Sequence, residues 1–187
     1  DLSGWRLMED NRPNYWSVQN GILSNIRPKD TDVQGANLYT ERTFGDCQLH
    51  VEFMVPKGSN SGVFLQSRYE VQIYDSYGRE VTTKICGALY GKVAPLVNAA
   101  KPAGEWQTFD VLFRQPKLGP NGKVIKPLRM TVYHNGIKVI ENAALRKPTG
   151  GPIPHKPIVT PAPLLLQGDH GSVYFKDIRI HPLNHRR

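Results

Sequence analysis

The sequence predicts an all-β protein, a two-sheet antiparallel sandwich of the jelly-roll type, and three observations lead to this fold class. The 187 residues include 17 Gly and 15 Pro spread along the chain, which leaves little room for long helices. No apolar stripe with a 3.6-residue period persists for three turns. About a dozen short strand-like segments recur at hairpin spacing, and the chain is longer than a simple seven-stranded sandwich needs. We expect one domain, residues 1–187, with a full core.

The first half of the chain contains a hairpin and a strand with clear alternation. Asn20-Gly21 separates two apolar segments between residues 15 and 26, and both residues tolerate the positive φ of a tight turn. Between residues 45 and 56 apolar and polar residues alternate, which predicts a strand with one buried face: Cys47, Leu49, Val51, Phe53 and Val55. A turn is expected at 58–62, followed by strands at 63–66 and 69–75.

The second half begins with residues 76–104, which show no strand pattern. A connection of that length is unusual unless it shapes a site. Strand character returns at 106–114, and Asn135-Gly136 predicts a hairpin within 129–140. Pro-rich residues 147–163 are expected to form an extended surface loop. Further segments are an insertion at 116–127 and final strands at 164–167 and 173–181.

The chain carries 24 Lys and Arg against 16 Asp and Glu, a formal net charge of +8. The basic residues are scattered singly and do not interleave with aromatic residues, so we expect a solvated basic surface and no nucleic-acid partner. No apolar run approaches the length of a membrane span, so no transmembrane segment is expected.

Two cysteines, Cys47 and Cys86, are too few for a four-thiolate zinc site or a dense disulfide framework. They are either bridged to each other or two buried thiols, and the sequence leaves both alternatives open.

The strand that contains Glu70, Gln72 and Asp75 is the most informative segment for chemistry. Glu70 and Gln72 face the same way in a regular strand, and a one-residue bulge would add Asp75 to that face. Two carboxylates placed that way could act as acid and base, or as acid and nucleophile, on a glycosidic bond. The spacing resembles the E-x-D-x-x-E pattern of laminarinase-type glycosidases, with Gln72 and Asp75 in place of two acids. The alternative is simply the polar face of an antiparallel strand.

Other candidate residues lie at predicted strand ends and turns, where sites tend to occur. His170 belongs to a polar, glycine-rich loop and could be a base near neutral pH or a metal ligand. Simpler roles are open for most of the others, such as a stabilised turn, a surface ion pair, a core tryptophan or an exposed histidine. These candidates are Asn60, Lys101, Glu105, Trp106, His134 and Gln167. The chain has no HExxH motif, phosphate-binding glycine loop, dinucleotide fingerprint or G-x-S-x-G elbow.

Taken in order, several segments resemble one family along nearly the whole chain, from about residue 4 to 181. The most specific are N-S-G-V at 60–63, Y-E-V-Q-I at 69–73, K-P-A-G-E-W at 101–106 and L-Q-G-D-H-G at 166–171. The chain is similar to the 3-keto-disaccharide hydrolase family, which has a concanavalin-like jelly-roll fold. The resemblance implies a secreted or periplasmic bacterial protein that acts on glycosides, particularly sugars oxidised at C3. Gln107 departs mildly from the family, which typically has Asn after the Trp.

The resemblance suggests a mechanism, because a 3-keto group acidifies the C2 proton and places the C1 leaving group β to the carbonyl. Cleavage by elimination and later hydration would need a base, an oxyanion donor and an acid. We expect Glu70 or His170 as the base, and Glu105 or His134 as the acid. Oxyanion contacts are expected from Lys101, Asn60 and Gln167, and a divalent cation could replace one of these donors.

A non-catalytic carbohydrate-binding module is the alternative function, since the same jelly roll serves lectins. It would make Trp and Tyr platforms more important than Glu70. Convergence of Glu70, Lys101, Gln167 and His170 on one concave face would favour the enzyme. A direct-displacement glycosidase would instead need the carboxyl groups of Glu70 and Asp75 about 5–9 Å apart across a groove.

Overall fold

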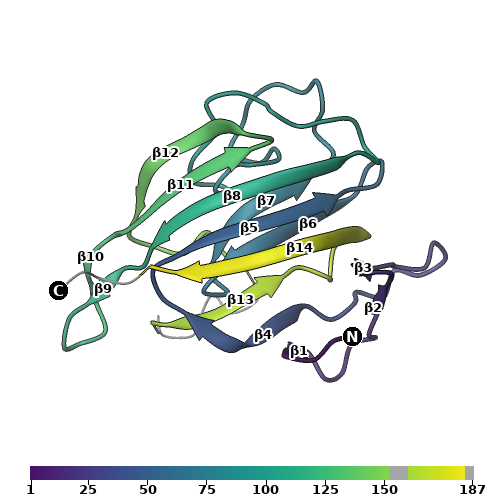
Figure 1. Ribbon diagram of the computed structural model, residues 1–187, viewed down its shortest axis with the longest axis horizontal. Helices are drawn as coiled ribbons and strands as arrows, with labels where there is room; N and C mark the ends of the chain where they lie inside the picture. Colours follow the sequence, from purple (N-terminus) through teal and green to yellow (C-terminus); the bar gives the residue numbers. More distant parts are fainter. Residues whose placement is uncertain (152–159, 184–187) are drawn as a thin grey trace.

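The computed structural model describes residues 1–151 and 160–183 and contains only strands as regular elements in those ranges. Figure 1 labels the fourteen strands along the chain. They are β1 (Trp5–Leu7), β2 (Trp16–Gln19), β3 (Ile22–Asn25), β4 (Leu38–Phe44), β5 (Cys47–Met54), β6 (Asn60–Leu65), β7 (Tyr69–Tyr74), β8 (Trp106–Arg114), β9 (Lys117–Leu118), β10 (Val124–Lys126), β11 (Leu128–His134), β12 (Ile137–Leu145), β13 (Ala162–Leu166) and β14 (Val173–Pro182).

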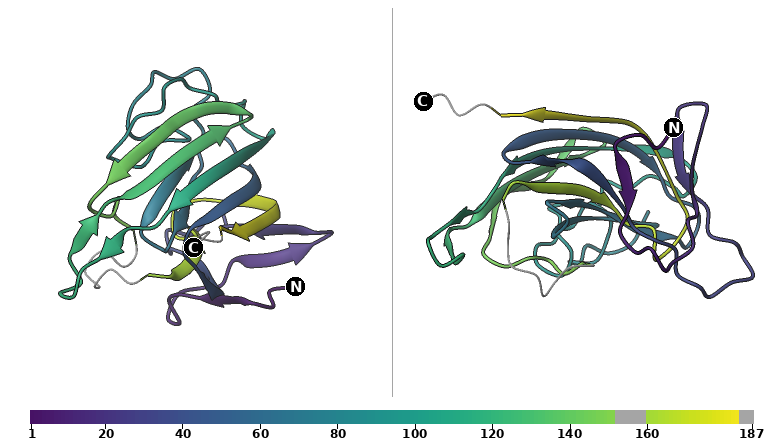
Figure 2. Two further views of the ribbon diagram at one scale, coloured as in Figure 1. Left: turned by 60° about the vertical axis from the view of Figure 1, so that its left-hand side comes forward. Right: turned by 90° about the horizontal axis from the view of Figure 1, so that it is seen from below.

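Two antiparallel sheets form the layers of the sandwich. The larger has the strand order β12-β11-β8-β5-β14-β3-β2, and the smaller has β1-β4-β13-β6-β7. Figure 2 shows the two layers edge-on, with the β9–β10 ribbon projecting at one end. The all-β, two-sheet prediction is therefore confirmed. None of the described residues belongs to a helix that could cross a bilayer.

A single hydrophobic cluster fills the space between the sheets and receives residues from both. On β5 the predicted apolar face, Cys47 to Phe53 at alternate positions, is buried. Phe109, Val111 and Phe113 on β8 are buried in the same way, because successive side chains of a strand point to opposite faces. Cys47 and Cys86 are both free and buried in this cluster, so they are two core thiols and form no bridge. Burial raises the pKa of the Cys86 thiol to about 12, which keeps it protonated.

Both Asn-Gly hairpins form as predicted, with positive φ at Asn20, Gly21, Asn135 and Gly136. Strands β1 and β4 were not predicted. Residues Glu41 to Thr43 of β4 are all exposed, so the alternation that marks a half-buried strand is missing there. The 116–127 insertion forms the β9–β10 ribbon. The predicted Pro-rich loop falls partly on residues 152–159, which lie outside the described residues, and β13 begins before its end.

The β6–β7 hairpin differs from the predicted turn at 58–62 and lacks the bulge that would have added Asp75 to the polar face. Asn60 to Gly62 begin β6 instead of completing a turn. The register from Asn60↔Tyr74 to Leu65↔Tyr69 is unbroken, so no bulge brings Asp75 to the face of Glu70 and Gln72. As expected, residues 76–104 contain no strand and make only isolated bridges, such as Val71↔Leu89. This long connection rises above β8 and β7 at the top of Figure 1.

Candidate active site

The β6–β7 hairpin places Asn60, Glu70 and Gln72 on the outer face of the smaller sheet. Strand β7 ends that sheet, yet its free edge is covered by other parts of the chain. Residues 87–90 pair with it through Gly87 N to Gln72 O (2.8 Å) and Tyr90 N to Glu70 O (3.3 Å). Thr149 Oγ1 accepts a hydrogen bond from Glu70 N at 2.9 Å. These contacts fix the backbone of β7 and bury the carboxyl group of Glu70 beneath the surrounding loops.

The Glu70 side chain is 5% exposed and packs directly over Gly62. A Cβ atom at position 62 would lie 2.5 Å from Glu70 Oε1, so only glycine leaves room for this carboxyl group. With its amide nitrogen turned toward the nearby oxygens, Gln72 donates to Glu70 Oε1 (2.9 Å) and to Ser61 O (3.0 Å). Burial raises the pKa of Glu70 to about 7 against an ordinary 4.5, with Asp169 adding to the rise and His170 opposing it. A carboxyl group with this pKa can exchange a proton near neutral pH.

The loop after β13 brings a second titratable pair to the same place, and tight packing of two glycines fixes its path. A Cβ atom at Gly168 would lie 2.3 Å from Ala36 O, and one at Gly171 would lie 2.3 Å from Ser59 Oγ. The buried amide of Asn25 donates to Gly168 O (3.1 Å) and Gly171 O (3.0 Å), which holds both ends of the loop. The residues between the glycines, Asp169 and His170, are therefore presented on a rigid support.

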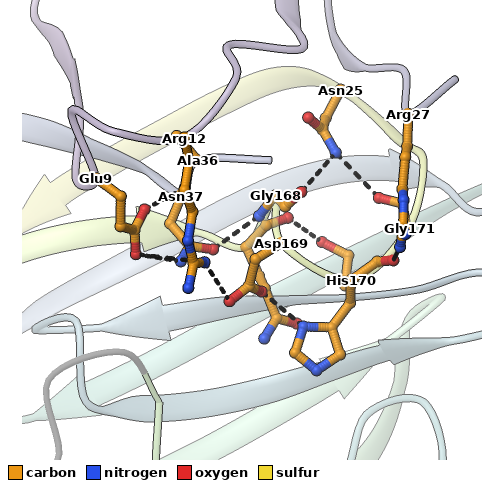
Figure 3. Close-up of polar contacts among 12 residues, drawn as sticks. Glu9, Arg12, Asn25, Arg27, Ala36, Asn37, Gly168, Asp169, His170 and Gly171 are labelled. Carbon is orange, nitrogen blue, oxygen red and sulfur yellow. Dashed lines mark hydrogen bonds and ion pairs between the residues drawn. The ribbon is translucent and has the colours of Figure 1, made fainter. Parts of the chain in front are cut away.

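Asp169 lies between a guanidinium group and an imidazole ring (Figure 3). Its Oδ1 is 2.6 Å from His170 Nδ1, and its Oδ2 accepts from Arg12 Nη1 at 3.3 Å. The hydrogen bond with Asp169 raises the pKa of His170. Burial alone would raise the pKa of Asp169, but its contacts with His170, Asn37 and Arg12 lower it below its ordinary value. The pair therefore favours an ionised carboxylate beside a protonated imidazole.

These groups converge on one pocket of about 270 Å³. Its wall contains Asn60, Glu70, Gln72, Gln167, Asp169 and His170, together with Phe64, Tyr90 and the segment Thr149 to Gly151. Asn60 Oδ1 and Gln167 Oε1 are buried and have no hydrogen-bond partner among the described residues. Buried polar atoms are normally satisfied, so two unpaired amide oxygens in one polar pocket indicate places where a ligand hydroxyl group could donate.

Five of the ten residues predicted from the sequence line this pocket, and five do not. The five in the pocket are Asn60, Glu70, Gln72, Gln167 and His170. Asp75 follows β7, and its Oδ2 accepts from Gly58 N at 2.8 Å, which closes the turn before β6. Asp75 does not line the pocket that contains Glu70.

The K-P-A-G-E-W segment also lies outside the pocket wall. Lys101 is exposed, and its Nζ donates to Trp106 O at 3.1 Å. Glu105 is exposed, and the Trp106 ring is covered by Lys176, whose Nζ lies 4.2 Å from the ring centroid. Three of the four residues expected to converge thus do so, and Lys101 does not.

His134 is fully buried in the core, contrary to the expectation that a histidine beside a tight turn is exposed. Its Nε2 is 2.9 Å from Gln107 Oε1, and its ring packs against Phe109 at a centroid distance of 4.9 Å. Burial lowers its pKa to about 4, with a further contribution from the charge of Lys101. His134 is therefore a neutral core side chain and does not line the pocket.

Sequence reasoning did not select Asp169, Arg12, Tyr90 or Thr149. Asp169 was within reach of such reasoning, because it lies beside His170 in a glycine-flanked loop. Arg12 contacts Asp169 from 157 positions away in the chain, and no local sequence pattern predicts that contact. Among the described residues, the group of His, Asp and Glu ligand atoms close enough to share a metal ion is His50, Glu52 and Asp177, outside this pocket. A cation in the pocket stays a prediction.

Comparison with known proteins places the chain in a family. The model of the 3-keto-alpha-glucoside-1,2-lyase-like domain matches residues 1–181. A 3-keto-disaccharide hydrolase of Bacteroides thetaiotaomicron is 24% identical over 142 residues, which are 59% of this chain and 49% of that protein. The chain therefore spans about half the length of this curated relative.

Solved structures of similar fold were also found. A protein of Parabacteroides distasonis, provisionally described as a glycosyl hydrolase, matches with a TM-score of 0.80 and 27% identity over 98% of this chain and 80% of that one. A carbohydrate-binding module of Bacillus subtilis matches in fold alone, with a TM-score of 0.56 and 8% identity over 97% of each chain. The chain belongs to the family of the 3-keto-alpha-glucoside-1,2-lyase-like domain and is similar to carbohydrate-active enzymes.

Proposed function

We propose that this protein cleaves the glycosidic bond of 3-keto-glucosides by β-elimination, followed by addition of water. The observation that carries the proposal is the convergence of a buried carboxyl group, Glu70, and a carboxylate-held imidazole, His170, on one polar pocket. Two groups with shifted pKa values in a single pocket are typical of acid–base catalysis. The family and the relative named a 3-keto-disaccharide hydrolase support the substrate class.

In the proposed reaction Glu70 is the base. Its carboxylate takes the proton from C2, and the electrons of the C2–H bond form an enolate that places negative charge on the C3 oxygen. Asn60 and Gln167 both lie in the pocket wall, where their side-chain NH2 groups would donate to that oxygen. Gln72 holds the base in place through its contact with Glu70 Oε1.

His170 is the proposed acid. Collapse of the enolate forms the C1=C2 bond, restores the C3 carbonyl and expels the oxygen on C1 with its electron pair. The protonated imidazole of His170 gives that oxygen a proton, and Asp169 stabilises the imidazolium beforehand. Water then adds its hydroxyl to C1 and its proton to C2, which yields the free 3-keto sugar.

Product analysis on matched substrates tests the proposal. Wild type should release the leaving group from a 3-keto-glucoside at least ~10²-fold faster than from the unoxidised glucoside, because only the ketone acidifies C2. Glu70→Gln keeps the shape of the side chain and removes the base, so the rate should fall about 10³-fold. Glu80→Gln makes the same chemical change at an exposed position outside the pocket and should retain activity. Equal cleavage of both glucosides would refute elimination, and saturable binding without cleavage would favour a carbohydrate-binding module.

A further inference from the structure

The N-terminal segment before β2 reaches the pocket through a chain of polar contacts that starts well outside it. Glu9 Oε2 accepts from Asn37 N at 2.8 Å, and Glu9 Oε1 accepts from Asn37 Nδ2 at 2.9 Å. Asn37 is fully buried, so this pair fixes the Glu9 carboxylate from two sides. Asn37 Oδ1 also accepts from Gly168 N at 2.9 Å, which ties the segment to the loop that carries Asp169 and His170.

Arg12 extends this arrangement to the catalytic pair. Its Nη1 lies 3.9 Å from Glu9 Oε1 and 3.3 Å from Asp169 Oδ2, so the guanidinium group bridges two carboxylates (Figure 3). The side chains are only partly exposed, 32% for Arg12 and 15% for Asp169, which limits screening of their attraction by water. Arg12 does not line the pocket itself.

The two oxygens of Asp169 have different partners, and this division has a geometric consequence. Arg12 holds Oδ2, which leaves Oδ1 directed at His170 Nδ1. The imidazole is thereby held by Nδ1, and its Nε2 is the nitrogen left to exchange a proton with a ligand. His170 O is fixed separately, because it accepts from Arg27 Nη1 at 3.1 Å.

We infer that Arg12 is a positioning residue of the site: held by Glu9, it orients the Asp169 carboxylate that orients the His170 imidazole. The role rests on the proposed function only in so far as His170 takes part in catalysis. The orientation itself is a property of the folded protein and can be measured without substrate.

Charges around His170 give Arg12 and Asp169 opposite effects on its protonation. Asp169 and, from β7, Glu70 stabilise the imidazolium and raise the pKa of His170, whereas the positive charge of Arg12 lowers it. Arg27 faces the carbonyl of His170, and Tyr90 is the remaining titratable group in the pocket wall. A residue that merely filled space would not change the protonation of His170 in a defined direction.

The test is a pH titration of the His170 ring protons by NMR in the whole chain, with the signal assigned from its loss in His170→Ala. Asp169→Asn should lower the pKa of His170, and Arg12→Gln should lower it too, because a released Asp169 no longer holds Nδ1; loss of the Arg12 charge alone would raise it. Arg12→Lys keeps the charge and should titrate closer to wild type than Arg12→Gln does. Arg6→Gln removes an equal charge from an exposed ion pair with Glu41 and should leave the titration unchanged.

Two results would overturn the inference: a His170 pKa in Arg12→Gln that is unchanged or higher, or an equal shift in Arg6→Gln. Activity gives a separate readout. If the protein cleaves 3-keto-glucosides, Arg12→Gln should lower kcat roughly tenfold with little change in KM, because the imidazole is less well oriented. A protein without that activity would refute the proposed function and leave the titration as an intact test of Arg12.

Discussion

The surroundings of His170 and of His134 show how the same side chain acquires opposite properties. His170 is on an exposed loop with a carboxylate 2.6 Å from its Nδ1, and its pKa is raised. His134 is in the core beside a neutral amide and aromatic rings, and its pKa is lowered to about 4. Both were predicted as proton carriers from the sequence. The structure shows that the partner and the access to water, and not the residue type, separate a catalytic candidate from a structural histidine.

The largest expected effects come from replacing each histidine by alanine: one variant should lose activity and the other should lose stability. His170→Ala removes the proposed acid, so kcat should fall about 10²- to 10³-fold while the fold persists. His134→Ala leaves a cavity and deprives Gln107 of a partner, which should cost about 2–4 kcal/mol of stability. Urea unfolding and steady-state kinetics on both variants check this. Full activity in His170→Ala, or a strongly reduced kcat in folded His134→Ala, would reverse the comparison.

The pH dependence of stability offers a sharper comparison between the pocket and the core. Between pH 4.5 and about 7, folded Glu70 keeps a proton that the unfolded chain has released, so stability falls as the pH rises. Between about pH 4 and 6.5, the unfolded chain protonates His134 and the folded protein does not, so stability falls as the pH falls. Each contribution is on the order of 3 kcal/mol, and the two oppose each other where their ranges overlap.

Glu70→Gln should show the pH dependence of stability that comes from His134 without the opposing contribution of Glu70. Over pH 7 to 4.5 its unfolding free energy should drop relative to that of wild type, and at pH 8 it should exceed that of wild type by on the order of 3 kcal/mol. Chemical denaturation at several pH values measures both quantities. Parallel curves for the two proteins would mean that the pKa of Glu70 is not raised in the folded state.

The smallest expected effect concerns Lys101, which the sequence placed in the site. Because its ammonium group contacts Trp106 O outside the pocket wall, Lys101→Ala should change kcat/KM less than about twofold. Its positive charge lowers the pKa of His134, so the variant should raise that pKa slightly. A loss of activity comparable to that in His170→Ala would show that Lys101 takes part in catalysis.

Local patterns predicted the fold well wherever one face of a strand is buried and the other is solvated. The alternation in β5 and the Asn-Gly turns are examples, and both are decided by neighbours in sequence. Strand β4 was not predicted, because buried and exposed residues do not alternate in its exposed stretch. Half of the predicted site residues line the pocket. Glu70, Gln72 and His170 could be predicted because strand alternation and a glycine-rich loop, both local patterns, place them there. Arg12 and the burial of His134 depend on contacts between distant segments, which one sequence does not display.

The central claim is that Glu70 removes the C2 proton of the substrate. A 3-keto-glucoside that carries deuterium at C2 tests it most directly. The substrate is cleaved in ordinary water, and the C2 position of the released sugar is followed by NMR from the earliest time points. The proposed elimination predicts a primary isotope effect on kcat or kcat/KM and a product that carries a solvent proton at C2. A released 3-keto sugar that retains the deuterium, formed at the same rate as from unlabelled substrate, would contradict the account.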